Sequence, residues 1–432
     1  MFVSECLQVN REGHLTIGGC DTVLLAQEYG TPLYVMDEDT IRRNCGMYRD
    51  SIAEYYGGKG MVLYASKAFC CKEMCRIVKE EGLGLDVVSG GELYTALQAG
   101  FPAQHIHFHG NNKTEEEICL ALKNHVGHFV VDNLTELHIL DRLAAQHGVV
   151  ANISLRIKPG IEAHTHKAVM TGQIDSKFGF ALETGEAMQA VKAAAAFRNI
   201  RLKGVHNHIG SQIFDIAPFQ AAAKIMLTFM EQIRSETGIV TEELNLGGGF
   251  GIAYTKQDTP VPYGDYMKEI SGTVSQTCQK LNFPVPFIFM EPGRSIAGEA
   301  GITLYRVGSV KEIPNVRTYV SVDGGMTDNP RYALYQSAYT AVHANRANLP
   351  ATQTVTVAGR CCESGDLLLE HTKLPPTQAG DLLAVLSTGA YNYSMASNYN
   401  RVCKPAVVMV RGGKPRIAVK RESYADLVKN DV

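Results

Sequence analysis

Hydrophobic residues in the middle of the chain gather in short runs that are rich in β-branched side chains. Each run is followed by Gly, Ser or Asn and then by a stretch in which apolar residues have helical spacing. The runs are 61–67, 85–89, 106–110, 128–133, 153–159, 202–210, 243–249 and 287–293. Strands that alternate with helices pair in parallel, and eight of them close into a barrel, so the pattern predicts a TIM-like (β/α)8 barrel.

The segments between these runs end in the way that helices do. Acidic residues stand early, and Gly or His stands late, in 91–100, 114–125, 133–148 and 185–197. This order is favoured because a helix has a positive amino end and a negative carboxyl end. These segments are therefore expected to be the crossover helices of the barrel.

The pattern changes after residue 293. Strand-like runs separated by turns follow at 303–313, 317–325, 352–360, 381–390 and 405–413, with few helical patterns between them. We therefore expect a C-terminal all-β domain. Residues 7–19 have the pattern of a β-hairpin, and we assign the N-terminal strands to the same domain. The expected limits are 1–36 for these strands, 37–292 for the barrel and 293–432 for the C-terminal domain.

Composition and charge narrow the range of partners. The 432 residues are 45% hydrophobic and 20% charged, which is typical of globular proteins. The formal net charge is -3 and there is no long basic run, so nucleic acid is not an expected partner. Glu5 and Arg11 interrupt the N-terminal segment before a signal peptide could form, and no apolar stretch approaches about 18 residues. We expect a cytoplasmic protein that has no membrane partner.

The 11 cysteines are expected to be reduced thiols, because their number is odd and no export signal is predicted. Cys70, Cys71 and Cys75 lie close together in the sequence, but a second pair of zinc ligands at the usual spacing is missing. Small buried residues on a helix are the favoured interpretation of these three cysteines.

Polar residues stand at the carboxyl ends of the predicted barrel strands, where barrel enzymes place their chemistry. They are Lys67, Asp86, Ser89, His107, His109, His206, His208, Ser211, Gly247, Gly248, Gly249, Glu291 and Arg294. Most lysines keep their ammonium group in water, but Lys67 ends an apolar strand. Partial desolvation there would make its amine a nucleophile able to form a Schiff base.

The glycines and the glutamate each allow two interpretations. Gly247, Gly248 and Gly249 can form a tight turn, or they can bring backbone amides close to a phosphate, and the position after the seventh strand favours phosphate. Glu291 can form a structural ion pair with Arg294, or it can face the nitrogen of a heterocyclic cofactor and hold it protonated.

Histidines offer a rival hypothesis. Histidines with the spacing His-x-His occur in three groups, namely 105/107/109, 164/166 and 206/208. Residues two apart on a strand share a face, so any such pair can chelate a metal. A metal-dependent hydrolase is therefore an alternative. That hypothesis leaves Lys67, the glycine run and Glu291 without a role, whereas an aldehyde cofactor with a phosphate uses all of them. We therefore expect no metal.

Nine ordered motifs across about 340 residues make the chain resemble the fold-type III pyridoxal-phosphate-dependent decarboxylases, and within them the diaminopimelate decarboxylases. The motifs are YASKA at Lys67, DVVSGGEL at Asp86, HTHKAVMTGQIDSKFG from His164, HNHIGSQ at His206, NLGGGFG at Gly247, EPGRS at Glu291, DGGMTDNPRYALY from Asp323, CESGD at Cys362 and GAYNYSMASNYN at Tyr391. The family has a barrel and a C-terminal β domain that includes the N-terminal strand.

The resemblance implies a site for pyridoxal 5'-phosphate. Lys67 would form the Schiff base, His208 would stack on the pyridine ring, and Glu291 would pair with the ring nitrogen. The remaining cofactor contacts implied by the motifs are Asp86, Ser211, Gly248, Gly249, Pro292, Gly293, Arg294 and Tyr391.

The resemblance also implies the substrate contacts and the assembly. Arg294, Arg331 and Tyr335 would hold the distal carboxylate of meso-2,6-diaminopimelate, Glu363 its distal ammonium, and Tyr391 would touch substrate and cofactor. Loss of CO2 would leave a carbanion stabilised by the pyridinium ring, and Cys362 would protonate it to give L-lysine, the last step of lysine biosynthesis. Cys362 would come from the partner subunit of a homodimer.

A physical argument supports this substrate. Its distal end is a zwitterion, which needs a cation for the carboxylate and an anion for the ammonium. Ornithine and arginine have no distal carboxylate, so Arg331 is the residue that discriminates. A polyamine-type decarboxylase and a catalytically silent cofactor-binding regulator are alternatives, and the presence of Lys67, Cys362 and Tyr391 argues against the silent one.

Overall fold

The structure, a computed structural model, describes residues 2–161 and 175–432. It divides into two compact units. One consists of residues 1–43, 252–259 and 294–432, and the other of residues 44–251 and 260–293. The histidine pair at 164/166 and most of the motif that begins there lie outside the described residues. The domain limits expected from the sequence stay a prediction.

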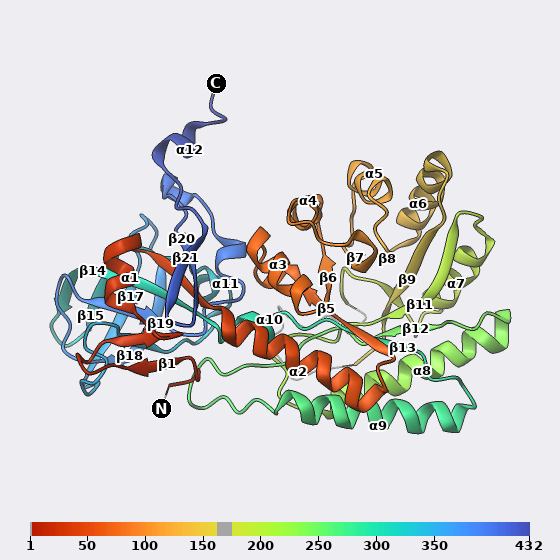
Figure 1. The fold of residues 1–432 in the computed structure, drawn as a ribbon, viewed down its shortest axis with the longest axis horizontal. Helices are drawn as coiled ribbons and strands as arrows, with labels where there is room; N and C mark the ends of the chain where they lie inside the picture. Colours follow the sequence, from red (N-terminus) through yellow and green to blue (C-terminus); the bar gives the residue numbers. More distant parts are fainter. Residues whose placement is uncertain (1, 162–174) are drawn as a thin grey trace. The chain divides into compact units, whose positions relative to one another are not determined.

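The second unit contains a closed parallel barrel (Figure 1). Its strands are β5 (Gly60–Ala65), β6 (Gly84–Val87), β7 (Ile106–Phe108), β8 (His128–Val131), β9 (Ala151–Lys158), β11 (Ile200–His206), β12 (Glu243–Asn245) and β13 (Phe287–Met290). All neighbours pair in parallel, and the pairing of β8 with β9 closes the ring. The predicted TIM-like barrel is therefore confirmed, with a short extra strand, β10 (Phe180–Ala181), beside β9.

Helices surround this ring, and Figure 1 shows α4 to α7 on its outside. The barrel unit contains α3 (Lys72–Glu80), α4 (Gly90–Gln98), α5 (Glu115–Lys123), α6 (Leu134–His147), α7 (Glu186–Ala196), α8 (Ala217–Thr237) and α9 (Tyr263–Leu281), and also residues 44–56 of α2 (Glu38–Tyr56). Their ends have local causes. Thr114 and Glu117 form a capping box at the start of α5, and Gly148 adopts a left-handed conformation that ends α6.

The first unit is rich in β-structure and brings together strands from both ends of the chain. One sheet has the order β18 (Leu367–Leu374), β17 (Gln353–Ala358), β15 (Arg317–Val322), β14 (Gly301–Ile313), β4 (Leu33–Asp37), β20 (Ala406–Arg411) and β21 (Lys414–Val419). Two more strands, β16 (Ala341–His343) and β19 (Leu382–Val385), extend from β14. The predicted association of N-terminal strands with the C-terminal ones is seen at β4, which pairs with both β14 and β20.

The expected hairpin at residues 7–19 also forms. It consists of β1 (Leu7–Val9) and β2 (Leu15–Ile17), followed by β3 (Cys20–Asp21). Short helices complete this unit, namely α1 (Thr22–Tyr29), α10 (Arg294–Ala297), α11 (Arg331–Tyr335) and α12 (Tyr424–Val428). Among the helices in the described ranges, none combines the length and apolar composition required to cross a bilayer.

A buried ion pair joins two neighbouring parts of the barrel. The ammonium of Lys113 lies 2.7 Å from Oε1 of Glu136, and both side chains are almost fully buried. Lys113 also donates to the carbonyls of Gly110 and Val130, at 2.9 and 2.8 Å. The other oxygen of Glu136 accepts the N–H of Asp132 at 2.9 Å, directly after β8. The pair therefore ties the loop before α5 to the carboxyl end of β8.

We expect the substitution Glu136→Ala to lower the free energy of unfolding by about 3–5 kcal/mol, because it leaves the Lys113 charge buried and unpaired. Urea unfolding of the wild type and the variant measures this difference. The control is Glu115→Ala, whose partner Arg142 lies 2.6 Å away at an exposed position. A loss for Glu136→Ala no larger than that of the control would contradict the prediction.

Candidate functional site

Lys67 lies at the carboxyl end of a barrel strand, as expected. Strand β5 ends at Ala65, and Lys67 follows in a short 3-10 helix, η1 (Ser66–Ala68). Ala65 pairs with Asp86 of β6. Burial raises the pKa of Asp86, and the charges of His109 and Lys67 oppose this shift. Burial also lowers the pKa of His208 well below its usual value, and the charge of Lys67 acts in the same direction. Lys67, Asp86 and His208 are thus electrostatic neighbours.

Glu291 is the centre of a buried polar network just after β13. Its Oε1 accepts the amide N–H of Asn245 at 2.7 Å and lies 2.8 Å from Nε2 of His109. Its Oε2 lies 2.9 Å from Nε2 of His206. These three partners stand at or just after the ends of β12, β7 and β11, so four strand ends meet at this carboxylate.

The charge state of this network follows from its surroundings. Burial alone raises the pKa of Glu291, but His109 and His206 outweigh burial, and the pKa lies well below its usual range. Burial lowers the pKa of His206 to about 4, although Glu291 opposes the shift. At neutral pH His206 is therefore an uncharged imidazole. Since a carboxylate can only accept hydrogen bonds, Nε2 of His206 carries the hydrogen and donates it.

The glycines at the ends of β12 and β13 leave no room for side chains. A Cβ atom on Gly248 would lie 2.1 Å from the carbonyl oxygen of Glu291, and one on Gly249 would lie 2.5 Å from that of Gly210. A Cβ on Gly293 would lie 2.9 Å from the Cβ of Ala65. The N–H of Gly248 points to Nδ1 of His208 at 3.3 Å. The backbones of these strand ends therefore approach each other more closely than any side chain would allow.

The other two predicted cofactor contacts of the barrel unit lie beside these glycines in the chain. Ser211 follows Gly210 and is half-buried. Pro292 is buried between Glu291 and Gly293, and its carbonyl oxygen accepts the N–H of Ala65 at 3.1 Å. This bond joins the segment after β13 to the end of β5, two residues before Lys67.

The metal hypothesis has one geometric candidate among the described residues, the group His109, His206 and Glu291, whose ligand atoms lie within 4.8 Å of one another. None of the predicted His-x-His pairs in the described ranges supplies both of its histidines to this group. His107 instead stacks on His128, with ring centroids 4.5 Å apart. The reason is that β7 and β11 end between the two histidines of each pair, so the strand alternation does not continue.

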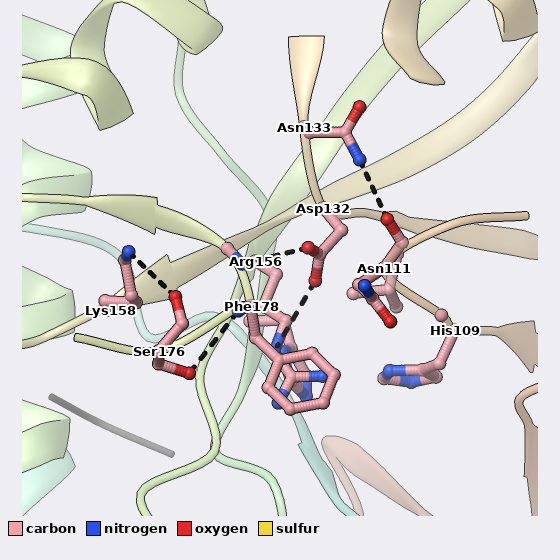
Figure 2. A network of polar contacts seen from close by, with 12 residues as sticks. His109, Asn111, Asp132, Asn133, Arg156, Lys158, Ser176 and Phe178 are labelled. Atoms are coloured by element: carbon pink, nitrogen blue, oxygen red, sulfur yellow. Dashed lines mark hydrogen bonds and ion pairs between the residues drawn. The ribbon is translucent and has the colours of Figure 1, made fainter. Parts of the chain in front are cut away.

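Arg156 is a further charged residue of the barrel mouth that sequence reasoning missed. Figure 2 shows its side chain beside Asp132 and Phe178. Its Nε lies 3.9 Å from Oδ1 of Asp132, and its guanidinium carbon lies 4.4 Å from the centroid of the Phe178 ring. Asp132 also accepts the N–H of Gly179 at 3.0 Å. Arg156 influences the pKa of both Asp86 and His208. Its position near the end of the predicted fifth barrel strand, β9, is the sequence feature that could have identified it as a site residue.

Asn245 was missed for a similar reason. It ends β12 directly before the glycine run. A polar residue at the end of an otherwise apolar barrel strand is the same signal that identified Lys67 and Glu291.

The predicted substrate residues lie in the other unit and include two buried arginines. Arg294 donates to the hydroxyl of Tyr254 at 2.5 Å, and Arg331 donates to the hydroxyl of Tyr339 at 2.6 Å. The guanidinium of Arg294 also lies 4.7 Å from the ring centroid of Tyr391. Tyr391 has a φ of +62°, a left-handed conformation that is uncommon for a tyrosine and is typical of functional sites.

The remaining predicted residues of this unit are more exposed. Cys362 and Glu363 are exposed, and Tyr335 is half-buried at the end of α11. The loop of Cys362 is nevertheless held in place, because its N–H donates to Asn400 at 2.7 Å. The buried carboxylate of Asp366 accepts the N–H groups of Cys361 and Met326, at 2.7 and 2.6 Å. Asp366 thereby links the loop of Cys362 to the loop that leads to α11.

The barrel residues fit pyridoxal phosphate. The cofactor has an aldehyde, a basic ring nitrogen and a phosphate. Lys67 provides an amine, Glu291 a buried anion, and Gly248 and Gly249 a strand end whose backbone carries no side chain. Asp86 has a buried oxygen, Oδ1, for which the described residues offer no hydrogen-bond partner.

Comparison with known proteins agrees with this fit. The family described as "Pyridoxal-dependent decarboxylase, pyridoxal binding domain" matches residues 38–298. A diaminopimelate decarboxylase of Bacillus subtilis (strain 168) is 50% identical over 432 residues, which are 100% of this chain and 98% of that protein. One from Halalkalibacterium halodurans is 51% identical with the same coverage. A crystal structure of diaminopimelate decarboxylase from M. jannaschii in co-complex with L-lysine has a TM-score of 0.92 and 35% identity, and the match covers 100% of this chain and 99% of that one. The chain therefore belongs to the diaminopimelate decarboxylase family of enzymes, and its cofactor is pyridoxal phosphate.

Proposed function

We propose that this enzyme decarboxylates meso-2,6-diaminopimelate to L-lysine and CO2, the last step of lysine biosynthesis. The observation that carries the proposal is the environment of Arg331. Its side chain is buried with 6% exposure, and among the described residues its partners are tyrosines and Ser337, with no carboxylate in an ion pair. A buried guanidinium favours a planar anion such as a carboxylate. Diaminopimelate has a carboxylate at the end that does not react, whereas ornithine and arginine do not.

The cofactor is assigned to residues of the barrel mouth and of the segment that follows it. Lys67 is the attachment point for the aldehyde, and His208 lies against the ring. The backbone of Gly248, Gly249 and Gly293–Arg294 holds the phosphate. Ser211, Asp86, Pro292 and Tyr391 complete the contacts. The cofactor, when bound, supplies an electron-poor ring that takes up the electron pair released by loss of CO2.

Glu291 maintains the electron-poor state of the ring. Because its pKa lies well below the usual range, it is an anion at neutral pH and stabilises a proton on the ring nitrogen. His206 and Asn245 support this role, since both donate hydrogen bonds to Glu291 without adding charge. With Glu291, the residues to which we assign catalytic roles are Lys67, His208 and Cys362.

The substrate is assigned to the residues of the β-rich unit. Arg294, Arg331 and Tyr335 bind the distal carboxylate, Glu363 binds the distal ammonium, and Tyr391 contacts both substrate and cofactor. Cys362 gives the proton of its thiol to the carbon that loses CO2, and this transfer completes lysine.

The active enzyme is proposed to be a homodimer with shared sites. Cys362 and Glu363 are exposed on the single chain although the reaction needs a site that excludes water. A second copy related by twofold symmetry would cover them and would repeat the contact twice.

A substrate panel tests the proposal. Purified enzyme is incubated with meso-diaminopimelate, ornithine or arginine, with and without added pyridoxal phosphate, and the CO2 released is measured. Cofactor-dependent CO2 from meso-diaminopimelate alone is the expected result. Release from ornithine or arginine at a comparable rate would favour a polyamine-type decarboxylase.

We expect Lys67 to carry the cofactor. Borohydride reduction of the holoenzyme followed by peptide mapping should find the pyridoxyl group on that residue, because Lys67 is the lysine at the end of β5, beside His208 and Asp86. A label on a different lysine would remove the central assignment. Sensitivity to chelators would then test the group of His109, His206 and Glu291 as a metal site.

We expect Arg331→Ala to raise the KM for meso-diaminopimelate severely. Loss of a charge-assisted clamp typically costs about 2–5 kcal/mol, and steady-state kinetics measure the effect. The control is Arg317→Ala, which removes an arginine that pairs with Glu370 at 2.6 Å on the surface. A wild-type KM in the Arg331 variant would mean that the substrate is not held by a distal carboxylate.

We expect two inactive variants to complement each other. Lys67→Ala and Cys362→Ala should each be nearly inactive, but their mixed dimers contain one site with both defects and one site with none. Mixing and reassociation of the two proteins should therefore restore part of the activity. If subunit exchange is demonstrated and no activity returns, each site belongs to one chain and the assignment of Cys362 to the partner is wrong.

A further inference from the structure

The hydroxyl group of Tyr339 has two donors as its neighbours. Nη1 of Arg331 donates to it at 2.6 Å, and Nδ2 of Asn392 donates to it at 3.2 Å. A guanidinium and an amide nitrogen cannot accept a hydrogen bond. The lone pairs of the hydroxyl oxygen are therefore directed to these two donors. The hydroxyl hydrogen points away from both of them and needs a different acceptor.

The orientation of Asn392 excludes the obvious acceptor. Nδ2 of Asn392 has two hydrogens; one faces Tyr339, and the other faces the carbonyl oxygens of Thr388 and Ala390, which lie 3.0 and 3.4 Å from Nδ2. If the amide were turned around, its oxygen would face these two carbonyl oxygens, which is unfavourable. Among the residues that the structure describes, no acceptor for the hydroxyl hydrogen of Tyr339 is found.

Tyr339 is a neutral donor under physiological conditions. It is 6% exposed, and burial raises the pKa of its hydroxyl although Arg331 opposes the shift. The hydrogen therefore stays on the oxygen at neutral pH. A buried hydroxyl hydrogen without an acceptor is unfavourable, and a ligand that supplies the acceptor removes this cost.

Tyr254 fixes the geometry around this hydrogen. Its ring lies 4.7 Å from the guanidinium of Arg331 and makes an edge contact with the ring of Tyr339, at 5.1 Å and 86°. Its hydroxyl accepts from Arg294, and its carbonyl oxygen accepts from Thr340 at 2.9 Å. One tyrosine thus contacts both arginines and Tyr339, so the donors are held in place before a ligand binds.

We propose that Tyr339 donates its hydroxyl hydrogen to the distal carboxylate of the substrate, next to Arg331, and so is a specificity-determining residue; this inference rests on the proposed function. The carboxylate receives a neutral O–H donor from Tyr339 and N–H donors from Arg331. Arg331 can donate to the carboxylate and to Tyr339 at the same time. A guanidinium has five N–H groups, which is more than its bonds to Tyr339 and Ser337 use. A diamine lacks the acceptor and leaves the hydroxyl hydrogen unsatisfied.

The test compares Tyr339→Phe with the wild-type holoenzyme. The KM for meso-diaminopimelate is expected to rise by about tenfold to a hundredfold, because a hydrogen bond to a charged group is lost. The kcat is expected to change by less than about threefold, since the bond is the same in the ground state and the transition state. The matched control is Tyr332→Phe, which removes a hydroxyl from α11 that is bonded to Glu370 instead.

Two inhibitors identify the group that Tyr339 recognises. L-Lysine has the carboxylate and cadaverine does not. Tyr339→Phe should weaken inhibition by lysine by the same factor as it raises KM, and it should leave inhibition by cadaverine unchanged. An unchanged KM, or equal weakening of both inhibitors, overturns the proposal. Equal inhibition of the wild type by lysine and cadaverine would instead overturn the distal carboxylate site of the proposed function.

Two further measurements test whether the hydroxyl contacts the cofactor instead of the substrate and cover the case in which Tyr339→Phe does not fold. The affinity for pyridoxal phosphate, measured by absorbance, is expected to be unchanged in Tyr339→Phe, and a large loss would assign the hydroxyl to the cofactor phosphate and overturn the proposal. If Tyr339→Phe does not fold, 3-fluorotyrosine at this position keeps the hydroxyl and makes it a stronger donor. Tighter binding of lysine is then expected, and unchanged binding would contradict the proposal.

Discussion

The buried carboxylate of Glu291 is the charge on which the arrangement of the barrel mouth depends. An anion in the interior of a protein is unfavourable unless hydrogen bonds and opposite charges surround it. Here Asn245, His206 and His109 from three other strand ends meet the requirement. The network therefore fixes the relative positions of four strand ends, and the same contacts keep Glu291 ionised. One set of interactions thus provides both the shape of the site and the electrostatic property that a pyridine ring requires.

The β-rich unit contains the opposite arrangement. Arg294 and Arg331 are buried cations whose neighbours are tyrosine rings and hydroxyl groups. At Arg331, tyrosines stabilise the guanidinium without neutralising it, so its positive potential stays available to a ligand. The anion of the barrel unit, Glu291, and the cations of the β-rich unit, Arg294 and Arg331, correspond to two different requirements of the proposed reaction. In that proposal, the anion would maintain the electron sink, and the cations would select a substrate with a carboxylate at its far end.

Close backbone contacts make both arrangements possible. At Gly248 and Gly249 the neighbouring carbonyls leave no space for a Cβ, which brings the ends of β12 and β13 together. At Gly325 and Gly359 a Cβ would collide with the carboxylate of Asp366. Asp366 can therefore reach the N–H groups of Met326 and Cys361 and hold the two loops of the substrate residues in one place.

The sequence alone determined the barrel, because most of the parallel strands are buried on both faces and are therefore short apolar runs that end at polar residues. The same local signal identified Lys67, the glycine run and Glu291. It did not identify Arg156 or Asn245 as site residues, although both stand near strand ends, since nothing local distinguishes an inward-facing polar residue from a solvated one. Tyr254 and Tyr339 had no local signal at all, because tyrosines are common in cores. Their roles depend on which arginines the chain brings beside them from positions 40 and 8 residues away. Motifs and periodicity are properties of short segments, whereas a hydrogen-bond network is a property of distances between segments, and only the tertiary structure decides those distances.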